Sequence, residues 1–308
     1  MNMKHEHIAA PRFFVAAFLV VMPAAIIAAD LKSETISHWE EYVSAVDAKN
    51  GLHLTPRAEF LSSDLIPGQI AKLRDGEIAV SPAEAHIPVK IPAGLIHDWV
   101  GAAFIPNATV KDVFGVVRDY DRYAEFYQPN VMKSKAVVVT DEKDQFSLVM
   151  MNKSAVGKTA LDCDYRTTYV RLDEHRWYSV SDSTRIQEIS EYGTRSQHIL
   201  PENHGTGLIW RLHTVTRFEE RDGGVYIELE AVALSRDIPS GVRWMVEPVV
   251  RRVSRSALST SLRSTASAML SHSGQSQIGS SDRGACSLSV SCQPNRLDSA
   301  KTPILSVR

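Results

Sequence analysis

Hydrophobic and polar positions alternate most clearly in two extended segments near the middle of the chain, residues 207–218 and 225–235. The turn Arg221–Gly224 lies between them. Two alternating segments around a short Asp-Gly turn predict an antiparallel β-hairpin. Pairing across this turn should place Phe218 opposite Ile227.

The two faces of this hairpin should differ, because successive side chains of a strand point to opposite faces. One face is expected to be apolar with a few hydroxyl groups: Trp210, Leu212, Thr214, Thr216, Phe218, Ile227, Leu229, Ala231 and Ala233. The other is expected to be charged and turned outward: Arg211, His213, Arg217, Glu228 and Glu230. The first face is what a sheet curved around a cavity would need.

The charged face has a structural interpretation. Arg217 should lie opposite Glu228, and a cross-strand pair of opposite charges contributes about 0.2–1 kcal/mol. Glu228 and Glu230 could instead form an acid–base pair, but ion pairing on an outward face explains them better. His213 is interpreted as a surface histidine.

The rest of the pattern indicates an α+β chain. Apolar positions recur every three or four residues over 33–48, which predicts an amphipathic helix. Residues 97–105 form an expected strand, and two short helices follow, the first capped by Thr109 with Asp112 completing a capping box. Four further strands, which short links make antiparallel neighbours, are expected at 132–140, 145–152, 160–172 and 177–189.

The C-terminal apolar segment, residues 242–269, changes phase along its length. One apolar stripe ends at Ala257, and a second begins at Leu258 on the opposite side of a continuous helix. Since a straight helix cannot bury both stripes against one sheet, two helices with a break near Ser254 are predicted. The Ser-rich residues 271–308 lose this periodicity and are expected to form a disordered tail.

The N-terminus has the pattern of a secretory signal. Lys4 and Arg12 precede an apolar run over residues 13–29, which is short for a membrane span. We therefore expect a cleaved signal peptide and a secreted or periplasmic protein, with an uncleaved anchor as the alternative. The net charge of −2 shows no basic excess, so nucleic acid is not an expected partner.

Metal and thiol chemistry find little support in the sequence. Cys163 alternates with apolar residues and is interpreted as a buried, inert thiol, while pairing of Cys286 with Cys292 is left open. The polar loop at residues 191–206 holds two histidines, but no carboxylate or thiol stands at ligand spacing. We interpret it as a rim or lid, and no metal or cofactor is expected.

Three local segments, residues 96–106, 113–129 and 226–239, resemble the START-like, or SRPBCC, helix-grip superfamily. This superfamily includes polyketide cyclases and coenzyme Q-binding proteins, and the chain resembles a secreted bacterial branch of it without assigned activity. The resemblance covers roughly residues 91–270. It implies a curved antiparallel sheet of about seven strands around a C-terminal helix, two short helices after the first strand, and a cavity for a hydrophobic molecule.

The expected organisation is a signal peptide (1–29), a helical extension (30–90), a START-like ligand-binding domain (91–270) and the tail (271–308). The residues expected to line the cavity are Leu161, Tyr165, Tyr169, Trp210, Leu212, Thr214, Thr216, Phe218, Leu229 and Ala231. Apolar walls with a few polar groups are typical of ligand cavities. The structural alternative is that these side chains pack against the C-terminal helix.

A binding protein for a lipid, quinone or polyketide-like molecule is the favoured function, since none of the common catalytic motifs is present. One alternative is a cyclase- or dehydratase-like enzyme that uses Tyr165 or Tyr169 with an inward acid. Another is an envelope interaction protein, in which the helix at 33–48 docks a partner and side chains fill the cavity. The arginines at 251–255 could touch anionic lipid, although a solvated helix face explains them. The oligomeric state is not predicted.

Overall fold

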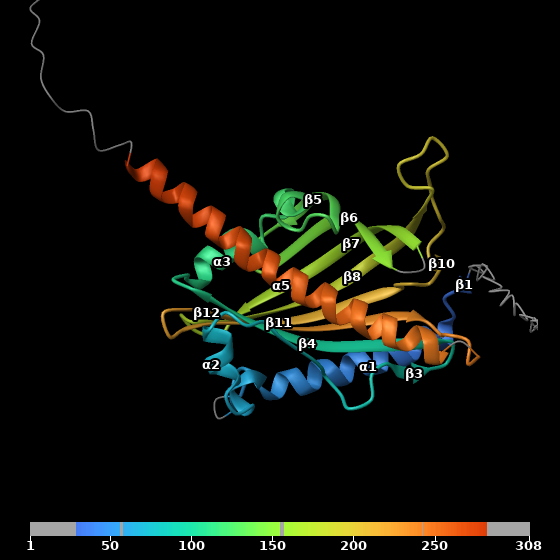
Figure 1. Ribbon diagram of the computed structural model, residues 1–308, viewed down its shortest axis with the longest axis horizontal. Helices are drawn as coiled ribbons and strands as arrows, with labels where there is room; N and C mark the ends of the chain where they lie inside the picture. The colour runs from blue at the N-terminus through green and yellow to red at the C-terminus, as the bar shows by residue number, and fades with distance from the viewer. Residues whose placement is uncertain (1–28, 56–57, 155–156, 242, 282–308) are drawn as a thin grey trace, which may run out of the picture.

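One curved antiparallel sheet forms the centre of the computed structural model, which describes residues 29–55, 58–154, 157–241 and 243–281 (Figure 1). Its strands run in the order β2-β4-β12-β11-β8-β7-β6-β5, with β3 also paired to β4. The strand bounds are β1 Ala29–Asp30, β2 Ala79–Pro82, β3 Val89–Ile91, β4 Gly94–Pro106, β5 Val131–Val139, β6 Lys143–Ser154, β7 Gly157–Arg171, β8 Arg176–Ser190, β9 His198–Ile199, β10 His204–Gly205, β11 Arg211–Arg221 and β12 Gly224–Arg236.

Helices precede, interrupt and follow this series of strands. Their bounds are α1 Ser33–Leu52, η1 Ser62–Leu65, α2 Gln69–Arg74, α3 Val110–Val117, η2 Tyr120–Arg122, α4 Tyr123–Phe126 and α5 Arg243–Ser281. A long strand, short helices, further antiparallel strands and a long C-terminal helix make up the predicted α+β helix-grip architecture, which is confirmed. The predicted signal peptide falls almost entirely outside the described residues.

The local rules that predicted individual elements hold in detail. The β11–β12 hairpin has the expected register, with Phe218 opposite Ile227 across the sheet. At the start of α3, the Thr109 side chain accepts a hydrogen bond from the Asp112 backbone N–H, and the Asp112 carboxylate accepts one from the Thr109 backbone N–H. These two bonds satisfy donors that the first helical turn leaves free.

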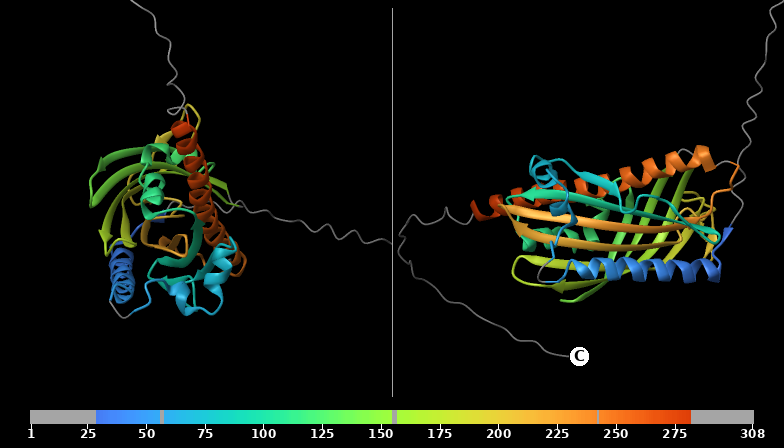
Figure 2. Two further views of the ribbon diagram at one scale, coloured as in Figure 1. Left: turned by 90° about the vertical axis from the view of Figure 1, so that its left-hand side faces the viewer. Right: turned by 90° about the horizontal axis from the view of Figure 1, so that it is seen from below.

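The sheet is sandwiched between α5 and α1, which lie on its opposite sides (Figure 2). We call the side toward α5 the inner face and the side toward α1 and α2 the outer face. At Gly101 of β4 the inner face meets α5 directly. A Cβ atom at this position would lie 2.8 Å from Leu262 Cδ1 and 2.9 Å from Leu258 Cγ. Glycine therefore permits the close approach of helix and strand.

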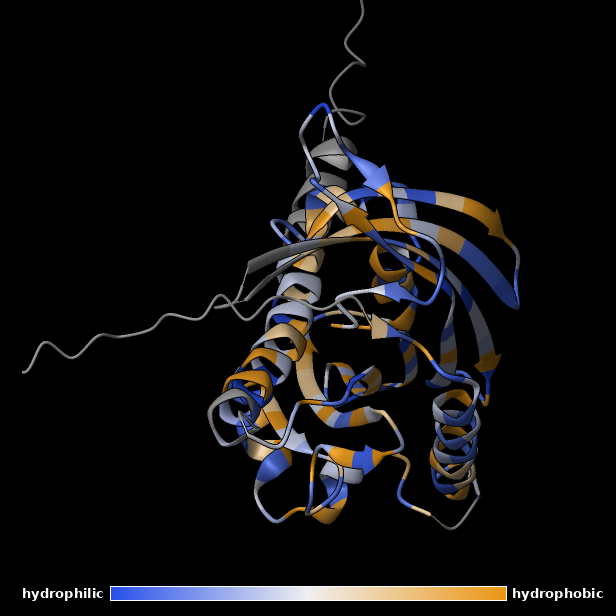
Figure 3. Ribbon diagram, turned by 90° about the vertical axis from the view of Figure 1, so that its right-hand side faces the viewer, coloured by the Kyte–Doolittle hydropathy of each residue, from blue (hydrophilic) through white to orange (hydrophobic). Residues whose placement is uncertain are grey.

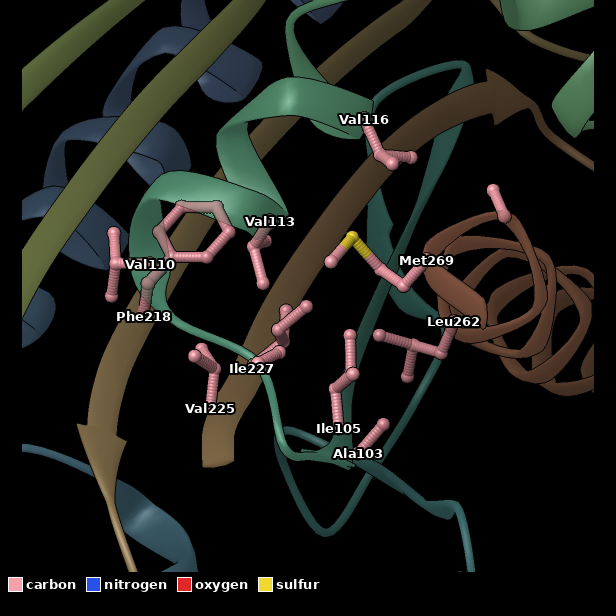
Figure 4. Packing of buried hydrophobic residues seen from close by; sticks show 12 residues of the cluster. Ala103, Ile105, Val110, Val113, Val116, Phe218, Val225, Ile227, Leu262 and Met269 are labelled. Atoms are coloured by element: carbon pink, nitrogen blue, oxygen red, sulfur yellow. The ribbon is translucent and has the colours of Figure 1, made fainter. Parts of the chain in front are cut away.

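One hydrophobic cluster joins α3, the sheet and α5 (Figure 4). Val113 of α3, Ile227 of β12 and Met269 of α5 meet there, and none is more than 4% exposed. Since the three elements are far apart in sequence, this cluster fixes how α5 lies across the sheet.

The prediction of two C-terminal helices is wrong, because α5 is continuous from Arg243 to Ser281. The stripe that begins at Leu258 is buried, whereas Val249 and Ala257 of the first stripe are exposed. A single helix therefore does not have to bury both stripes. The expected tail from residue 271 is also wrong in its first part, which is helical, and its remainder lies outside the described residues.

The N-terminal extension covers the outer face, and helix α1 interleaves hydrophobic and hydrophilic positions along its length (Figure 3). Trp39 of α1 packs against Val232 and Leu234 of β12, and its side chain is buried. Leu73 of α2 packs with Tyr226 in a second cluster. Because Trp39 is buried within its own chain, it does not offer α1 to a separate partner in the way one alternative required.

The expectation that the charged residues point into solvent is wrong. Arg217 and Glu228 are 3% and 1% exposed, and an Arg217 Nη2–Glu228 Oε1 contact of 2.7 Å joins them. Asn50 of α1 accepts a hydrogen bond from Arg217, and the backbone N–H groups of Ser62 and Ser63 donate to Glu228. The predicted ion pair is present, but beneath the extension, whose polar groups form hydrogen bonds with both residues.

His213 is likewise not a surface residue, since its side chain is 1% exposed. Its ring nitrogens contact Asp182 at 2.8 Å and Asp47 of α1 at 3.1 Å. Burial alone lowers the pKa of His213, but these two carboxylates outweigh it and raise the pKa above the usual value.

Candidate functional site on the inner face

Hydroxyl groups cross the inner face in a row perpendicular to the strands. The register places Thr167 opposite Ser181, Ser181 opposite Thr214, and Thr214 opposite Ala231. Ala231 in turn lies opposite Trp99 of β4. The Thr167 hydroxyl donates to Ser181 Oγ at 2.7 Å, so part of the row is internally hydrogen-bonded.

A second row runs parallel to the first. Tyr169, Ser179, Thr216, Leu229 and Gly101 occupy successive strands at the same level. Gly101 is the position under α5, so this row leads from the hydroxyl-bearing strands to the helix. In both rows the hydroxyl groups come from β7, β8 and β11, and the residues without a hydroxyl come from β12 and β4.

The centre of the inner face is only partly covered by packing. Five of the predicted cavity residues lie there, and each keeps an intermediate exposure: Leu212, Thr214, Thr216, Leu229 and Ala231. Their outward-pointing neighbours His213 and Val215 are buried. A small molecule can therefore reach this area from solvent.

Aromatic packing closes one end of the face. Phe218 meets Phe114 of α3 edge to face, with ring centroids 5.2 Å apart, and Phe114 also meets Tyr169 at 5.5 Å. Phe218 is 3% exposed and belongs to the α3–α5 cluster. Phe218 and Tyr169, two of the predicted cavity residues, therefore form one end of the inner face.

The other predicted residues of β7 are also packed. Tyr165 stacks on Phe146 with centroids 5.2 Å apart, and Phe146 stacks on Tyr120 at 4.1 Å. Leu161 lies in the same cluster. Stacks of this kind hold η2 on the sheet, so Leu161 and Tyr165 contribute to the hydrophobic core of this end.

Trp210 does not share the face of Leu212, which corrects the sequence prediction. It precedes β11, which begins at Arg211, and its backbone N–H donates to Leu234 O at 2.7 Å. Its indole packs with Trp39 and Val232 on the outer face. Alternation fails because Trp210 lies outside the regular strand.

An inward acid is present that sequence reasoning missed. Asp144 of β6 is fully buried, and Arg118 Nε and Nη2 bind its two carboxylate oxygens at 2.9 and 2.7 Å. Tyr120 donates to Asp144 at 2.8 Å and lies 3.0 Å from the Tyr169 hydroxyl. Burial raises the pKa of both tyrosines well above the usual value, so their hydroxyls stay protonated.

The serines of β8 were also missed, although the sequence carried a signal for them. Ser179, Ser181 and Ser183 occupy every second position of one strand, and the register brings all three to the inner face. The Ser183 hydroxyl accepts a hydrogen bond from the Leu212 backbone N–H at 2.9 Å. Because the cavity residues were sought mainly among apolar and aromatic positions, these serines were not assigned to the face of Leu212 and Tyr165.

Cys163 is buried, as predicted, and burial raises the pKa of its thiol to about 12. Within the described part of the chain, no group of three or more His, Cys, Asp or Glu side chains could hold a metal ion. In the same residues, no helix is both long and apolar enough to cross a membrane.

Two hollows lie away from the inner face. One of about 380 Å³ lies between α4 and α5, where Arg263, Ser264 and other mostly polar residues line it. The second, of about 190 Å³, lies between α1 and the outer face, beside Leu54 and Arg217. Polar residues line most of the first, with Phe126 and Ala268 as its apolar lining, and the second is small, so neither matches a site for a sizeable apolar molecule.

Comparison with solved structures finds chains of similar fold at low identity. A STAR-related lipid transfer protein from Xanthomonas axonopodis is 19% identical, with a TM-score of 0.36 over 60% of this chain and 98% of that chain. Human STARD10 is 9% identical, with a TM-score of 0.40 over 74% and 88%. Zhui aromatase/cyclase from a Streptomyces species is 14% identical, with a TM-score of 0.36 over 56% and 93%.

No protein-family model and no curated protein sequence matches this chain. The fold assignment therefore rests on the architecture itself: a long first strand, short helices, a series of antiparallel strands, and a C-terminal helix across the inner face of a curved sheet. The chain has a START-like helix-grip fold.

Proposed function

We propose that the protein binds a hydrophobic small molecule on the inner face, between the sheet and α5. The carrying observation is that the apolar and hydroxyl-bearing residues at the centre of this face remain half-exposed, while the alternate residues of β11 and β12, on the opposite face, are buried. Apolar surface left open to water favours a guest that covers it, at about 25 cal/mol per Å² removed from water. The molecular class proposed is a lipid, quinone or polyketide-like compound.

Binding is better supported than catalysis. An acid–base role for Tyr169 would require its hydroxyl to lose a proton, and burial raises the pKa of that hydroxyl above the usual value. The one inward carboxylate described above, Asp144, is held by Arg118 and Tyr120. These contacts give both groups a structural role at the edge of the face.

We further propose that the binding protein works outside the cytoplasm after removal of residues 1–29. Sequencing the N-terminus of the protein secreted by its host would test this. A mature chain that begins near Asp30 supports the proposal, and a retained Met1 contradicts it.

Native mass spectrometry of the full chain, purified without detergent and followed by organic extraction, tests the binding function. A co-purifying apolar molecule is expected, and Ala231→Phe should displace it by filling the space beside Thr214. Gln145→Phe is the matched control, because Gln145 is exposed and points away from the inner face. Absence of a bound molecule, together with no affinity for added lipids or quinones, would contradict the proposal.

A further inference from the structure

Two nitrogen-bearing side chains of β4 lie at the border of the half-exposed area. His97 and Trp99 are two residues apart on one strand and therefore point to the same face, the inner one. Ala233 lies opposite His97 and Ala231 opposite Trp99, and both alanines are half-exposed. The small alanine side chains leave room beside the two larger residues.

The hydrogen bonds of His97 define which of its nitrogens carries the proton. Nε2 lies 2.9 Å from Ser235 Oγ, and the Ser235 hydroxyl donates to the Arg236 carbonyl at 3.2 Å. Ser235 Oγ therefore accepts from Nε2–H, which leaves Nδ1 as an acceptor. Burial lowers the pKa of His97 to about 4, so the ring is neutral at physiological pH.

His97 Nδ1 has no hydrogen-bond partner among the described residues, although the side chain is only 5% exposed. Trp99 Nε1 likewise has no hydrogen-bond partner among these residues. The Trp99 side chain is 8% exposed, and its ring packs against Ile87 and Leu258. An indole N–H can only donate. One buried acceptor and one buried donor, two residues apart on the same face of β4, thus remain unsatisfied, and such groups normally have partners.

We propose that His97 Nδ1 and Trp99 Nε1 form a subsite for a hydroxyl group of the bound apolar molecule. A hydroxyl matches the pair because it donates to His97 and accepts from Trp99. An ether or ketone oxygen can accept but cannot donate, and a carboxylate would also bring a charge into a neutral site. The ligand class is therefore an apolar alcohol, an inference that rests on the proposed binding function.

Affinity for three probes with the same alkyl chain tests this subsite in the full-length protein. Decan-1-ol, 1-methoxydecane and sodium decanoate would be titrated against one displaceable fluorescent lipid. The alcohol is expected to bind about tenfold more tightly than the ether, as is common for a site built around a buried hydroxyl partner. This comparison needs no substituted protein, so folding defects cannot confuse it.

Two substitutions then assign the roles of donor and acceptor. His97→Phe should abolish the preference for alcohol over ether, whereas Trp99→Phe should weaken both probes about fivefold to tenfold and preserve most of the apolar contact. Trp244→Phe and His175→Phe are the controls, since both residues are exposed and lie outside the inner face. They should leave all affinities unchanged.

The outcomes separate the two proposals. Equal binding of alcohol and ether by the unsubstituted protein, or a preference that survives in His97→Phe, would overturn the hydroxyl subsite and leave the binding function standing. Failure of all three probes and of the fluorescent lipid to bind would overturn both.

Discussion

The two faces of the sheet reverse the usual relation between charge and burial. The outer face carries Arg217, Glu228, Glu230 and His213, yet the N-terminal extension covers it and each of these side chains is buried. The inner face carries neutral hydroxyl and apolar groups around Thr214, yet its centre stays half-exposed. Side-chain polarity alone therefore does not indicate which side of this sheet faces water.

The two faces also differ in how their side chains find partners. Charges can be buried on the outer face because every one described meets a hydrogen-bonding partner, many of them from α1 and η1. The neutral groups of the inner face need no fixed charged partner, and a bound molecule can cover their half-exposed apolar surface. We infer that the outer face secures the extension, while the inner face is kept available for a guest.

Removal of a buried charge should give the largest effect on stability. Glu228→Ala leaves Arg217 buried without its ion-pair partner, and such a loss costs about 3–5 kcal/mol of unfolding free energy. Urea denaturation followed by circular dichroism would measure it. Glu125→Ala, which breaks the exposed Arg122–Glu125 pair, is the control and should leave the midpoint unchanged. Equal effects of the two substitutions would show that the outer face is not sealed.

A smaller loss is expected where the inner face meets α5. Gly101→Ala places a methyl group against Leu258 and Leu262, and overpacking of this kind costs about 1–3 kcal/mol. Gly115→Ala in α3 is the matched control, because nothing lies within 4 Å of a Cβ there and alanine favours a helix. A neutral result at Gly101 would mean that α5 does not press on this strand.

The stability of the folded protein should also depend on pH through Asp98 on the outer face, whose pKa is raised from 3.8 to about 7. Burial is the main cause and the charge of Glu230 adds to it, while Tyr42 and Lys49 act in the opposite direction and Glu84 adds a small increase. Since the folded state holds a proton that the unfolded state loses, stability should fall between about pH 4 and pH 7.

Substitution of this carboxyl isolates its contribution. Asp98→Asn mimics the protonated group. Between pH 5 and pH 8, the free energy of unfolding of the variant should therefore rise by about 1–2 kcal/mol relative to that of the unsubstituted protein. Urea midpoints of both proteins at the two pH values provide the measurement. The difference cancels the opposite trend from His97, whose lowered pKa makes it lose stability as pH falls. A constant difference would contradict a raised pKa at Asp98.

Exchange of a hydroxyl and a methyl group should distinguish the two faces, with the smallest effect on the inner one. Thr214→Val on the half-exposed inner face should change stability by less than about 0.5 kcal/mol. Val232→Thr on the outer face should lower the free energy of unfolding by about 1–3 kcal/mol, because it buries a hydroxyl group at a position that is fully shielded from water. Thermal unfolding of both variants would compare them, and equal losses would indicate that both faces are closed.

The sequence was sufficient to predict features set by short-range rules. The hairpin register follows from alternation and a Gly-containing turn, and the Thr109–Asp112 capping box follows from a spacing of three residues. Alternation also identified Leu212, Thr214 and Ala231 as residues of one face. These features depend on neighbours that the chain places close together.

The sequence could not show which face would be covered. Asn50 and Ser63 satisfy the charges of β11 and β12 from more than 160 positions away, and nothing local marks them as partners. The continuity of α5 was missed for a related reason. Its first apolar stripe remains partly exposed at Val249, and periodicity alone cannot reveal that a stripe is left unburied.

Thiol accessibility tests most directly whether the inner face is open and the outer face sealed. Thr214→Cys and Val232→Cys would each be made with Cys286 and Cys292 replaced by serine. Cys163 can stay, since it is buried and burial raises its pKa to about 12. Rapid maleimide labelling at position 214, suppressed by decan-1-ol, with no labelling at position 232, is the expected result. Equally slow labelling at both positions would contradict an open inner face.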